Sequence, residues 1–344
     1  MIGENKYLII YHKEDNDGVF SAALMQDYIM ARLGIDAGDI DLMPADYNDM
    51  ETMARKCSPS ELSSMYSNLI MVDISFNEKW MKSLYNEMGN KLVWCDHHSP
   101  IILASHMKKF DDILGVRETN RSAILCVWKY LYDQFDEQFK KRKCPLLLRA
   151  LSAWDSFSYA REKMTLDYAR HVNIGTDYKV KLDISNAIEV VHDIVSVYVD
   201  GKDGIAMDVK SKDKKLVRDL EKIGKMLCSY DDRKNADLVM RYGDCTWQVE
   251  ALDGSLRSAC ALFLQGPSSS MMFKSLPSSI ENGIVFKRNI DSSWSFSLYN
   301  TSEQDKFHCG ELLKARYGGG GHSGAAGCTI KEPTFLKILK TKKI

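Results

Sequence analysis

Aspartate and histidine side chains gather in four short stretches of the first 160 residues. The first stretch, HKEDNDG at residues 12–18, has the pattern H-x-x-D-x-D-G. The others are the aspartate of VDIS, the run CDHH and the aspartate of AWDS. Aspartate and histidine are both common metal ligands. The candidate side chains are His12, Asp15, Asp17, Asp73, Asp96, His97, His98 and Asp155.

A group of several carboxylates restricts the chemistry that such a site can perform. Carboxylates packed together repel one another, and burying them without partners is costly. Divalent cations remove that cost, and a mixture of carboxylate and imidazole suits Mn²⁺, Co²⁺, Fe²⁺ or Zn²⁺ better than Mg²⁺ alone. Two ions about 3.5–4 Å apart can share one carboxylate, which is a common arrangement for phosphoryl hydrolysis. The pattern therefore favours a hydrolytic site with two metal ions.

Helix capping is the alternative explanation for each of these aspartates. A single aspartate at the end of a strand is more often a helix cap than a ligand, and Asp15 or Asp73 alone would indicate no more than that. Four such stretches in one half of the chain, each at the end of a predicted strand or helix, favour the metal site.

The elements around these stretches alternate between strand and helix, which predicts a parallel sheet with helices on both faces. In such a sheet, ligands bind at the carboxyl ends of the strands, where the first three stretches lie. The predicted strands are Tyr7–Tyr11, Asp41–Pro44, Asn68–Ile74 and Lys91–Cys95. The predicted helices are Gly18–Leu33, residues 60–67, Glu78–Met88, residues 121–135 and Pro145–Ala153.

The second half of the chain has a different pattern. Two helices are predicted at residues 184–199 and 212–229, the latter as a charged, solvated connection. From residue 236 onward, short strands and turns indicate a second α/β domain. Strands are predicted at Ala236–Arg241 and Thr246–Leu252, helices at Arg257–Leu264 and Cys309–Tyr317, and a hairpin at Gly283–Lys287 and Trp294–Tyr299. The run GGGGHSGAAG follows at residues 318–327.

The composition is that of an ordinary globular protein. The 344 residues are enough for two domains, and 45% are hydrophobic and 27% charged. A formal net charge of −1 gives no general attraction to nucleic acid or to anionic membranes. Nine cysteines, scattered and without a CxxC pair, predict reduced thiols and a cytoplasmic location. We expect no signal peptide and no membrane span.

The four stretches resemble the four motifs of the DHH phosphoesterase superfamily, and GGGGHSGAAG resembles the signature of its accessory nucleotide-binding domain, called DHHA1. The order and spacing agree from about residue 7 to residue 330. The superfamily contains single-strand DNA exonucleases, short-RNA nucleases, cyclic dinucleotide phosphodiesterases and inorganic pyrophosphatases. The size of the chain and its compact first motif are most similar to the short-RNA nucleases of the NrnB type. GVRETNRSA at residues 115–123 is also similar to a stretch in that group.

This resemblance implies a division of the chain and a role for each motif residue. A catalytic domain with a parallel sheet is expected at residues 1–160, a helical connection at 161–235 and a smaller α/β substrate-binding domain across a cleft at 236–344. One metal ion would be bound by His12, Asp15 and Asp73, and the other by Asp17, Asp73, His97 and Asp155, so that Asp73 bridges the two. His98 would steady or protonate the phosphate, and Asp96 would orient a ligand histidine.

Substrate contacts are expected from the second domain. Glycines let backbone N–H groups come close to a phosphate or base, so the loop of Gly319, Gly320 and Gly321 is a candidate for this contact. His322 would contact the substrate phosphate. Arg316 and Arg121 are further candidates for substrate binding. The strand before the loop departs from the family pattern, because Tyr299 and Asn300 stand where many members have arginine and serine.

The expected function is a metal-dependent phosphodiesterase that hydrolyses short oligonucleotides. The expected cofactors are two divalent ions, with Mn²⁺ preferred and Co²⁺ or Mg²⁺ as alternatives. Short oligonucleotides or small nucleotides are the expected partners, without a membrane, and a homodimer is left open. One alternative is a hydrolase of cyclic dinucleotides or other small nucleotides. An alternative of another class is a catalytically silent nucleotide-binding regulatory module.

Overall fold

The computed structural model describes most of the chain and divides it into two units, Met1–Leu227 and Cys228–Ile344. The described residues are 6–47, 52–54, 57–98, 110, 112–133, 144–195, 205–266, 268–301, 308–321 and 324–331.

The first unit is built on a four-stranded parallel sheet with the order β2-β1-β3-β4. Its strands are β1 (Tyr7–His12), β2 (Ile40–Ala45), β3 (Asn68–Val72) and β4 (Leu92–Cys95). The predicted α/β class with a parallel N-terminal sheet is therefore confirmed. Because all four strands point the same way, their carboxyl ends meet at one edge of the sheet.

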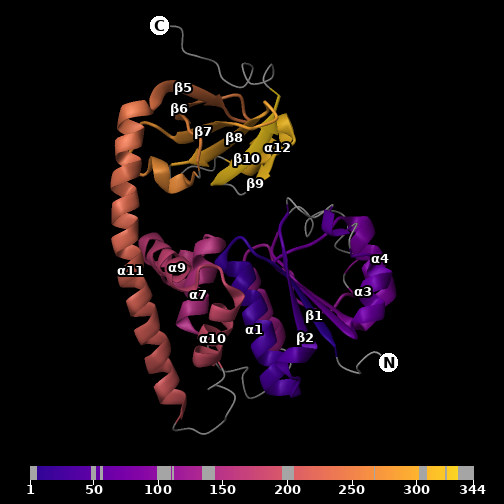
Figure 1. Ribbon diagram of the computed structural model, residues 1–344. Coiled ribbons are helices and arrows are strands. Elements are labelled where there is room, and N and C mark those ends of the chain that lie inside the picture. Colours follow the sequence, from indigo (N-terminus) through magenta and orange to yellow (C-terminus); the bar gives the residue numbers. More distant parts are fainter. Residues whose placement is uncertain are drawn as a thin grey trace. The chain divides into compact units, whose positions relative to one another are not determined.

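Helices cover both faces of this sheet, which explains why its strands are apolar along their length. Side chains alternate between faces along a strand, so Leu8 and Ile10 enter one core while Ile9 and Tyr11 enter the other. The helices α3 (Pro59–Met65) and α4 (Glu78–Met88) pack on the first of these cores. The helix α1 (Asn16–Leu33) packs on the other face of the sheet, as Figure 1 shows.

Further helices enclose the core on the α1 side. They are α6 (Ala123–Trp128), α7 (Leu146–Asp155), α9 (Leu166–Val180) and α10 (Ile184–Val195), each of which contributes buried side chains. A π-helical turn at Lys129–Asp133 continues α6, and the short helix α8 (Tyr159–Glu162) follows α7. Single 3₁₀ turns precede β2 at Ala37–Asp39 and β4 at Gly89–Lys91.

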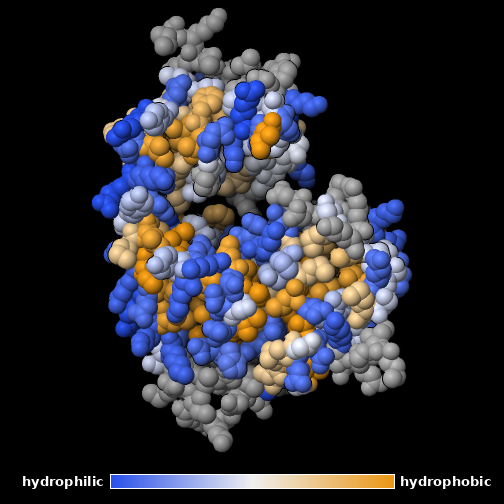
Figure 2. All heavy atoms as spheres, in the orientation of Figure 1, coloured by the Kyte–Doolittle hydropathy of each residue, from blue (hydrophilic) through white to orange (hydrophobic). Residues whose placement is uncertain are grey.

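The helix α11 (Ile205–Tyr242) is longer than the predicted helix at residues 212–229. Val217 and Leu220 are buried against the first unit, whereas most of the charged side chains around them are exposed. Figure 2 shows hydrophilic side chains along the outer side of this helix. The predicted charged helix is confirmed, but only one of its faces is solvated, since the other packs into the core of the first unit. None of the described helices is long and apolar enough to cross a membrane.

The second unit contains a six-stranded mixed sheet with the order β5-β6-β7-β8-β10-β9. Only the β6–β7 pair is parallel. The strands are β5 (Asp244–Glu250), β6 (Leu256–Phe263), β7 (Asn282–Arg288), β8 (Trp294–Asn300), β9 (Gly320–Gly321) and β10 (Ala325–Ile330). The helix α12 (Cys309–Tyr317) packs on one face, and a 3₁₀ turn at Ser270–Phe273 packs on the other. The predicted β7–β8 hairpin and the helix at Cys309–Tyr317 are confirmed.

Two predictions for the second half of the chain are wrong, and one helix of the first unit was not predicted. Arg257–Leu264 is predicted as a helix, but most of it lies in β6, where burial between two strands overrides helix propensity. Ala236–Arg241 was predicted as a strand but continues α11, whose last turn ends just before Gly243. The helix that was not predicted is α9, which contributes Val172 and Val180 to the core of the first unit.

Candidate metal centre

The first motif lies where β1 passes into α1. Asp15 is the N-cap of α1, and its Oδ1 accepts a hydrogen bond from the Gly18 N–H at 3.0 Å. Its Oδ2 points instead to His12 Nδ1, 3.2 Å away. Asp15 is therefore both the helix cap that its position suggested and part of the polar cluster. A Cβ added to Gly18 would lie 2.0 Å from the carbonyl oxygen of His12, so only glycine allows this close approach of helix and strand.

Asp17 lies in the first turn of α1 and is held by the backbone of another helix. Its Oδ2 accepts a hydrogen bond from Ala123 N at 2.7 Å, and its Oδ1 accepts one from Ile124 N at 3.0 Å. These N–H groups belong to the first turn of α6, where a carboxylate is favoured by the unpaired donors and by the helix dipole. The orientation of Asp17 is therefore fixed before any ligand binds.

Asp73 follows the last residue of β3 and has an unusual backbone conformation. Its φ angle is 58°, in the left-handed region that residues other than glycine rarely adopt. Its N–H donates to the Cys95 carbonyl at 3.0 Å, which fixes it beside the end of β4. The side chain is only 1% exposed. Both of its carboxylate oxygens are buried and accept no hydrogen bond from the residues that the structure describes.

The third motif follows β4, and its three residues face different ways. Asp96 Oδ1 accepts hydrogen bonds from His97 N at 2.7 Å and His98 N at 3.1 Å, and it lies 2.8 Å from His98 Nδ1. Asp96 Oδ2 accepts one from the Trp94 indole at 3.3 Å. Both oxygens of Asp96 are thus occupied within the protein, whereas His97 Nε2 is directed at three other aspartates. This geometry suits Asp96 for orienting His98 rather than for binding a metal ion.

These side chains and Asp155, the last residue of α7, converge into two groups that share Asp73. In the first, His12 Nδ1 lies 3.2 Å from Asp15 Oδ2 and 3.5 Å from Asp73 Oδ2. In the second, His97 Nε2 lies 3.3 Å from Asp73 Oδ1, 3.3 Å from Asp155 Oδ2 and 3.5 Å from Asp17 Oδ2. Asp73 therefore presents one oxygen to each group. His98 Nδ1 also lies 3.6 Å from Asp73 Oδ1.

Burial and mutual repulsion raise the pKa of several carboxyl groups in the cluster. Burial, together with the charges of Asp17 and Asp15, raises the pKa of Asp73 well above its usual value. Burial raises the pKa of Asp17 although His97 opposes the shift. Burial, together with the charge of Asp17, also raises the pKa of Asp155 well above its usual value. The protein alone therefore does not fully compensate these buried negative charges.

Protonated histidines offset part of the negative charge of these carboxylates. Burial lowers the pKa of His12, but the adjacent carboxylates of Asp15 and Asp73, 3.2 and 3.5 Å from its Nδ1, outweigh burial and raise that pKa to about 10. Burial also lowers the pKa of His97, but the charges of Asp155 and Asp17 outweigh it and the pKa is raised.

The donor set fits divalent cations. Each of three overlapping groups offers three ligand atoms that all lie within 4.8 Å of one another. These groups are His12, Asp15 and Asp73; Asp17, His97 and Asp155; and Asp73, His97 and His98. Four buried atoms of these groups have no hydrogen-bond partner among the described residues, namely His12 Nδ1, Asp73 Oδ1, Asp73 Oδ2 and Asp155 Oδ2. A cation would satisfy these atoms and offset the repulsion between the carboxylates.

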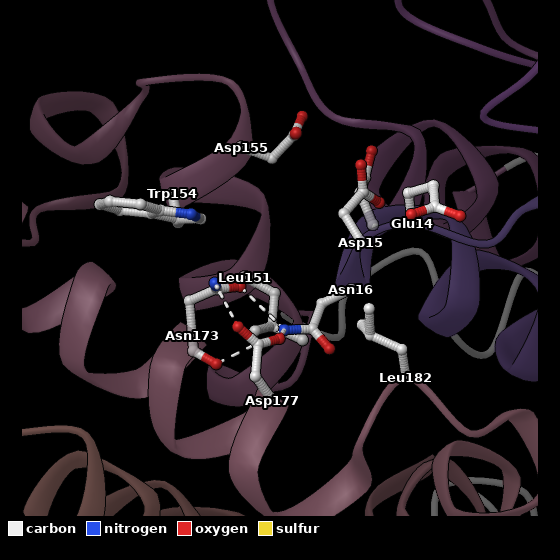
Figure 3. A pocket seen from close by; sticks show the side chains of 10 residues that line it. Glu14, Asp15, Asn16, Leu151, Trp154, Asp155, Asn173, Asp177 and Leu182 are labelled. Atoms are coloured by element: carbon white, nitrogen blue, oxygen red, sulfur yellow. Dashed lines mark hydrogen bonds between the residues drawn. The ribbon is translucent and has the colours of Figure 1, made fainter. Parts of the chain in front are cut away.

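Sequence reasoning missed several side chains at this centre. The ring of Tyr47 lies with its centroid 5.4 Å from that of His12 and 5.2 Å from that of His98. Asn16, between the two aspartates of the first motif, is buried and contacts Asn173 and Asp177 of α9 (Figure 3). Tyr47 lies just after β2, which ends at Ala45, but a lone tyrosine there does not indicate a metal ligand, and α9 itself was not predicted, so the pattern contained no signal for these contacts.

The residues predicted to bind substrate make different contacts within the protein. Arg121 pairs with Glu118, its Nε 2.9 Å from Glu118 Oε2. Arg316 donates from Nη2 to the Ala251 carbonyl at 3.0 Å, so it supports the fold of the second unit. Gly320 and Gly321 form β9 and pair with β10, so the glycine run is part of a sheet rather than a linker. His322 lies outside the described residues.

Tyr299 is packed and does not offer a stacking surface. It is 7% exposed, and its hydroxyl lies 2.9 Å from that of Ser268. Gly319 is also tightly packed, because an added Cβ would lie 2.4 Å from the Gly327 carbonyl oxygen.

No family model and no curated protein matches the chain. Among solved structures it is similar to PggH, a pGpG-specific phosphodiesterase from Vibrio cholerae, with 14% identity, a TM-score of 0.47 and coverage of 97% of this chain and 96% of that one. It is similar to an exopolyphosphatase-related protein from Bacteroides fragilis, with 12% identity, a TM-score of 0.44 and coverage of 97% and 90%. It is also similar to the exonuclease RecJ bound to manganese, with 13% identity, a TM-score of 0.43 and coverage of 97% and 88%. At these identities and TM-scores, function has to be argued from the site.

Proposed function

We propose that this chain is a metal-dependent phosphodiesterase of the DHH type that hydrolyses short oligonucleotides. The observation that carries the proposal is Asp73, whose two oxygens face two separate groups of aspartate and histidine without any hydrogen-bond partner among the described residues. A carboxylate placed between two ligand sets is the arrangement that a two-metal phosphoryl-transfer site needs.

Each group of side chains is assigned one divalent ion. His12, Asp15 and Asp73 would hold the first, and Asp17, Asp73, His97 and Asp155 the second. The presence of imidazole in both sets favours Mn²⁺ or Co²⁺ over Mg²⁺. When bound, the two ions would polarise the phosphate and lower the pKa of a water molecule between them.

His98 is proposed to act on the phosphate. Its Nδ1 is held at 2.8 Å by Asp96 Oδ1, which fixes the ring and leaves Nε2 to donate a proton or a hydrogen bond. Burial lowers the pKa of His98, but its hydrogen bond with Asp96 outweighs burial and raises the pKa. A raised pKa favours the protonated ring, which suits His98 to give a proton to the leaving oxygen or to steady a phosphate charge.

Substrate binding is assigned in part to the second unit, as the motif GGGGHSGAAG suggests. The backbone of Gly319, Gly320 and Gly321 and the side chain of His322 are proposed to contact the nucleotide. Arg316 and Arg121 are proposed to contribute positive charge near the phosphate. In this proposal residues 161–235 connect a catalytic domain, residues 1–160, to a substrate-binding domain, residues 236–344.

Hydrolysis of defined substrates tests this proposal. The full chain is incubated with Mn²⁺ and a panel of labelled dinucleotides, longer RNA, single-stranded DNA and cyclic dinucleotides. We expect the highest kcat/KM for dinucleotides and no turnover in excess EDTA. A preference for cyclic dinucleotides would instead support the small-nucleotide hydrolase. Nucleotide binding without turnover of any substrate or of a generic nitrophenyl phosphodiester would support the silent regulatory module and overturn the proposal.

A further inference from the structure

Two cysteines of the second unit lie opposite each other near the start of β5. The antiparallel pairing of β5 with β6 shifts its register between Asp244 and Trp247. Cys245 and Thr246 of β5 therefore oppose the single residue Cys260 of β6, which is the arrangement of a β-bulge. The side chains of Cys245 and Cys260 are joined by a hydrogen bond. The bulge thus brings two thiols into contact across a pair of strands.

Asp244 fixes the shape of this bulge. Its Oδ1 accepts hydrogen bonds from the Thr246 N–H at 3.0 Å and from the Thr246 hydroxyl at 2.7 Å. Its Oδ2 accepts one from the Trp247 indole at 2.8 Å. An aspartate that bonds to the backbone two residues later forms a tight local turn. The position of Cys245 is therefore set by the residues on both sides of it.

Cys260 is the buried member of the pair. It belongs to the core of the second unit, together with Val239 of α11. A Cβ added to Gly243 would lie 2.8 Å from Cys260 Sγ, so glycine at this position leaves room for the thiol beside the end of α11. Burial, together with the hydrogen bond with Cys245, raises the pKa of the Cys260 thiol to about 12. A buried, protonated thiol of this kind does not react with reagents in solution by itself.

Cys245 is the exposed member of the pair, and it lies on the edge strand of the sheet. A small oxidant can therefore reach its sulfur. Residues that oppose each other in antiparallel strands have Cα atoms about 4.5–5.5 Å apart. A disulfide spans a Cα separation of about 4.4–6.8 Å, so the two cysteines can be bridged without separating the strands. An accessible thiol next to a second thiol that can resolve it is typical of redox-sensitive cysteines.

We propose that Cys245 and Cys260 form a redox modification site, at which hydrogen peroxide converts the two thiols into a reversible disulfide. The thiolate of Cys245 attacks one peroxide oxygen, the O–O bond breaks, and Cys245 becomes a sulfenic acid as hydroxide leaves. The sulfur of Cys260 then attacks the sulfenic sulfur, the S–O bond breaks, and the departing hydroxide takes the Cys260 proton. Two thiols and one peroxide give one disulfide and two water molecules. A dithiol reductant reverses the reaction by thiol–disulfide exchange.

The cross-link would fasten the edge strand β5 to its only neighbour in the described sheet, β6. Segments at the margin of a structure open locally at a lower free energy than the core does. A disulfide restricts such opening by closing a loop between the two strands. We therefore expect amide hydrogen exchange in β5 to slow by about tenfold or more when the pair is oxidised.

Peptide mapping of the full, unaltered chain tests the proposal. The reduced protein is treated with a small excess of hydrogen peroxide, the remaining thiols are blocked, and the digest is analysed by mass spectrometry without reduction. We expect one linked pair, Cys245 with Cys260, which is two hydrogens lighter than its reduced peptides and is separated by dithiothreitol. A disulfide between two copies through Cys245, or oxidation of Cys245 to a sulfinic acid without a linked pair, would overturn the proposal. Unchanged hydrogen exchange in β5 after cross-linking would overturn the effect on the strand.

Two variants assign the two steps. In Cys260→Ser the resolving thiol is absent, so Cys245 should remain a sulfenic acid that dimedone traps. In Cys245→Ser the buried Cys260 should stay reduced. The matched control is Cys328→Ser, a partly exposed cysteine on β10 of the same unit, which should keep the wild-type cross-link. Circular dichroism verifies that each variant is folded. Oxidation of Cys260 at the wild-type rate in folded Cys245→Ser would overturn the assignment of Cys245 as the attacking thiol.

Discussion

The Nε2 atom of His97 lies 3.3 Å from Asp73 Oδ1, although the two residues follow different strands. Asp73 follows β3 and His97 follows β4, and the hydrogen bond from Asp73 N to the Cys95 carbonyl, 3.0 Å long, holds the two strand ends together. The other oxygen of Asp73 faces His12 at the end of β1, 3.5 Å away. Asp73 is thus the side chain through which three adjacent strand ends form one centre.

Replacing Asp73 should disable the centre while the fold is retained. We expect Asp73→Asn to lose Mn²⁺ affinity by at least about 10²-fold and to lose hydrolysis of every substrate. Asparagine tolerates the left-handed backbone at φ 58°, whereas Asp73→Ala should add about 1 kcal/mol of strain. Isothermal titration with Mn²⁺ measures the loss of metal affinity, and circular dichroism measures whether the fold is retained. A well-folded Asp73→Asn protein with wild-type turnover would rule out this centre, and His97→Ala should give the same loss.

Metal preference follows from the two histidines. We expect activity with Mn²⁺ or Co²⁺ to exceed activity with Mg²⁺, because imidazole favours later transition metals and Mg²⁺ favours oxygen ligands. The measurement is kcat/KM for one dinucleotide after chelation and addition of each ion at equal free concentration. Equal or higher rates with Mg²⁺ would contradict the assignment of both His12 and His97 as ligands.

Metal affinity should rise with pH. In the metal-free protein the pKa of His12 is raised to about 10, so the imidazole is protonated at neutral pH and must lose this proton to bind an ion. The affinity for Mn²⁺ should therefore increase by about tenfold per pH unit for each displaced proton. The stability of the metal-free protein should change with pH in the opposite direction. A histidine whose pKa is raised on folding stabilises the fold fully when the pH is below its unfolded pKa of about 6.5, and this stabilisation is lost as the pH rises toward 10. Mn²⁺ titrations between about pH 6 and pH 8 test this, and a constant affinity would exclude His12 as a ligand.

The clustering of the candidate metal ligands was largely predictable because its signals are local in the sequence. Strand ends, the aspartate cap and the glycine of the first motif are all visible within a few residues. The contacts of α9 were not predictable, because they depend on α9 packing against α1, and the contact of Asn16 with Asp177 spans 161 residues. The error in β6 has the same origin, since Ala259 and Leu262 are buried between two strands that sequence periodicity cannot reveal.

His322 should affect recognition more than metal binding. If the second unit contacts the nucleotide, His322→Ala should reduce kcat/KM for a dinucleotide much more than for a nitrophenyl phosphodiester, and Mn²⁺ affinity should stay unchanged. His308→Ala, an exposed histidine near the start of α12, is the matched control and should alter neither substrate. Equal losses for both substrates would assign His322 to the chemical step. No loss for either would exclude the second unit from this reaction.

Gly18 should be required for the centre even though it has no side chain to bind an ion. A Cβ at this position would lie 2.0 Å from the His12 carbonyl oxygen, so Gly18→Ala must push α1 away from the end of β1. That shift moves the first turn of α1, where Asp17 lies, relative to His12. We expect the free energy of unfolding to fall by about 1–3 kcal/mol and Mn²⁺ affinity to fall with it.

Gly38→Ala is the matched control, because nothing lies within 4 Å of an added Cβ there, and it should be neutral or slightly stabilising. Urea unfolding and Mn²⁺ titration of both variants decide the question. If Gly18→Ala retained wild-type affinity, the close approach of helix and strand would have no part in positioning the ligands.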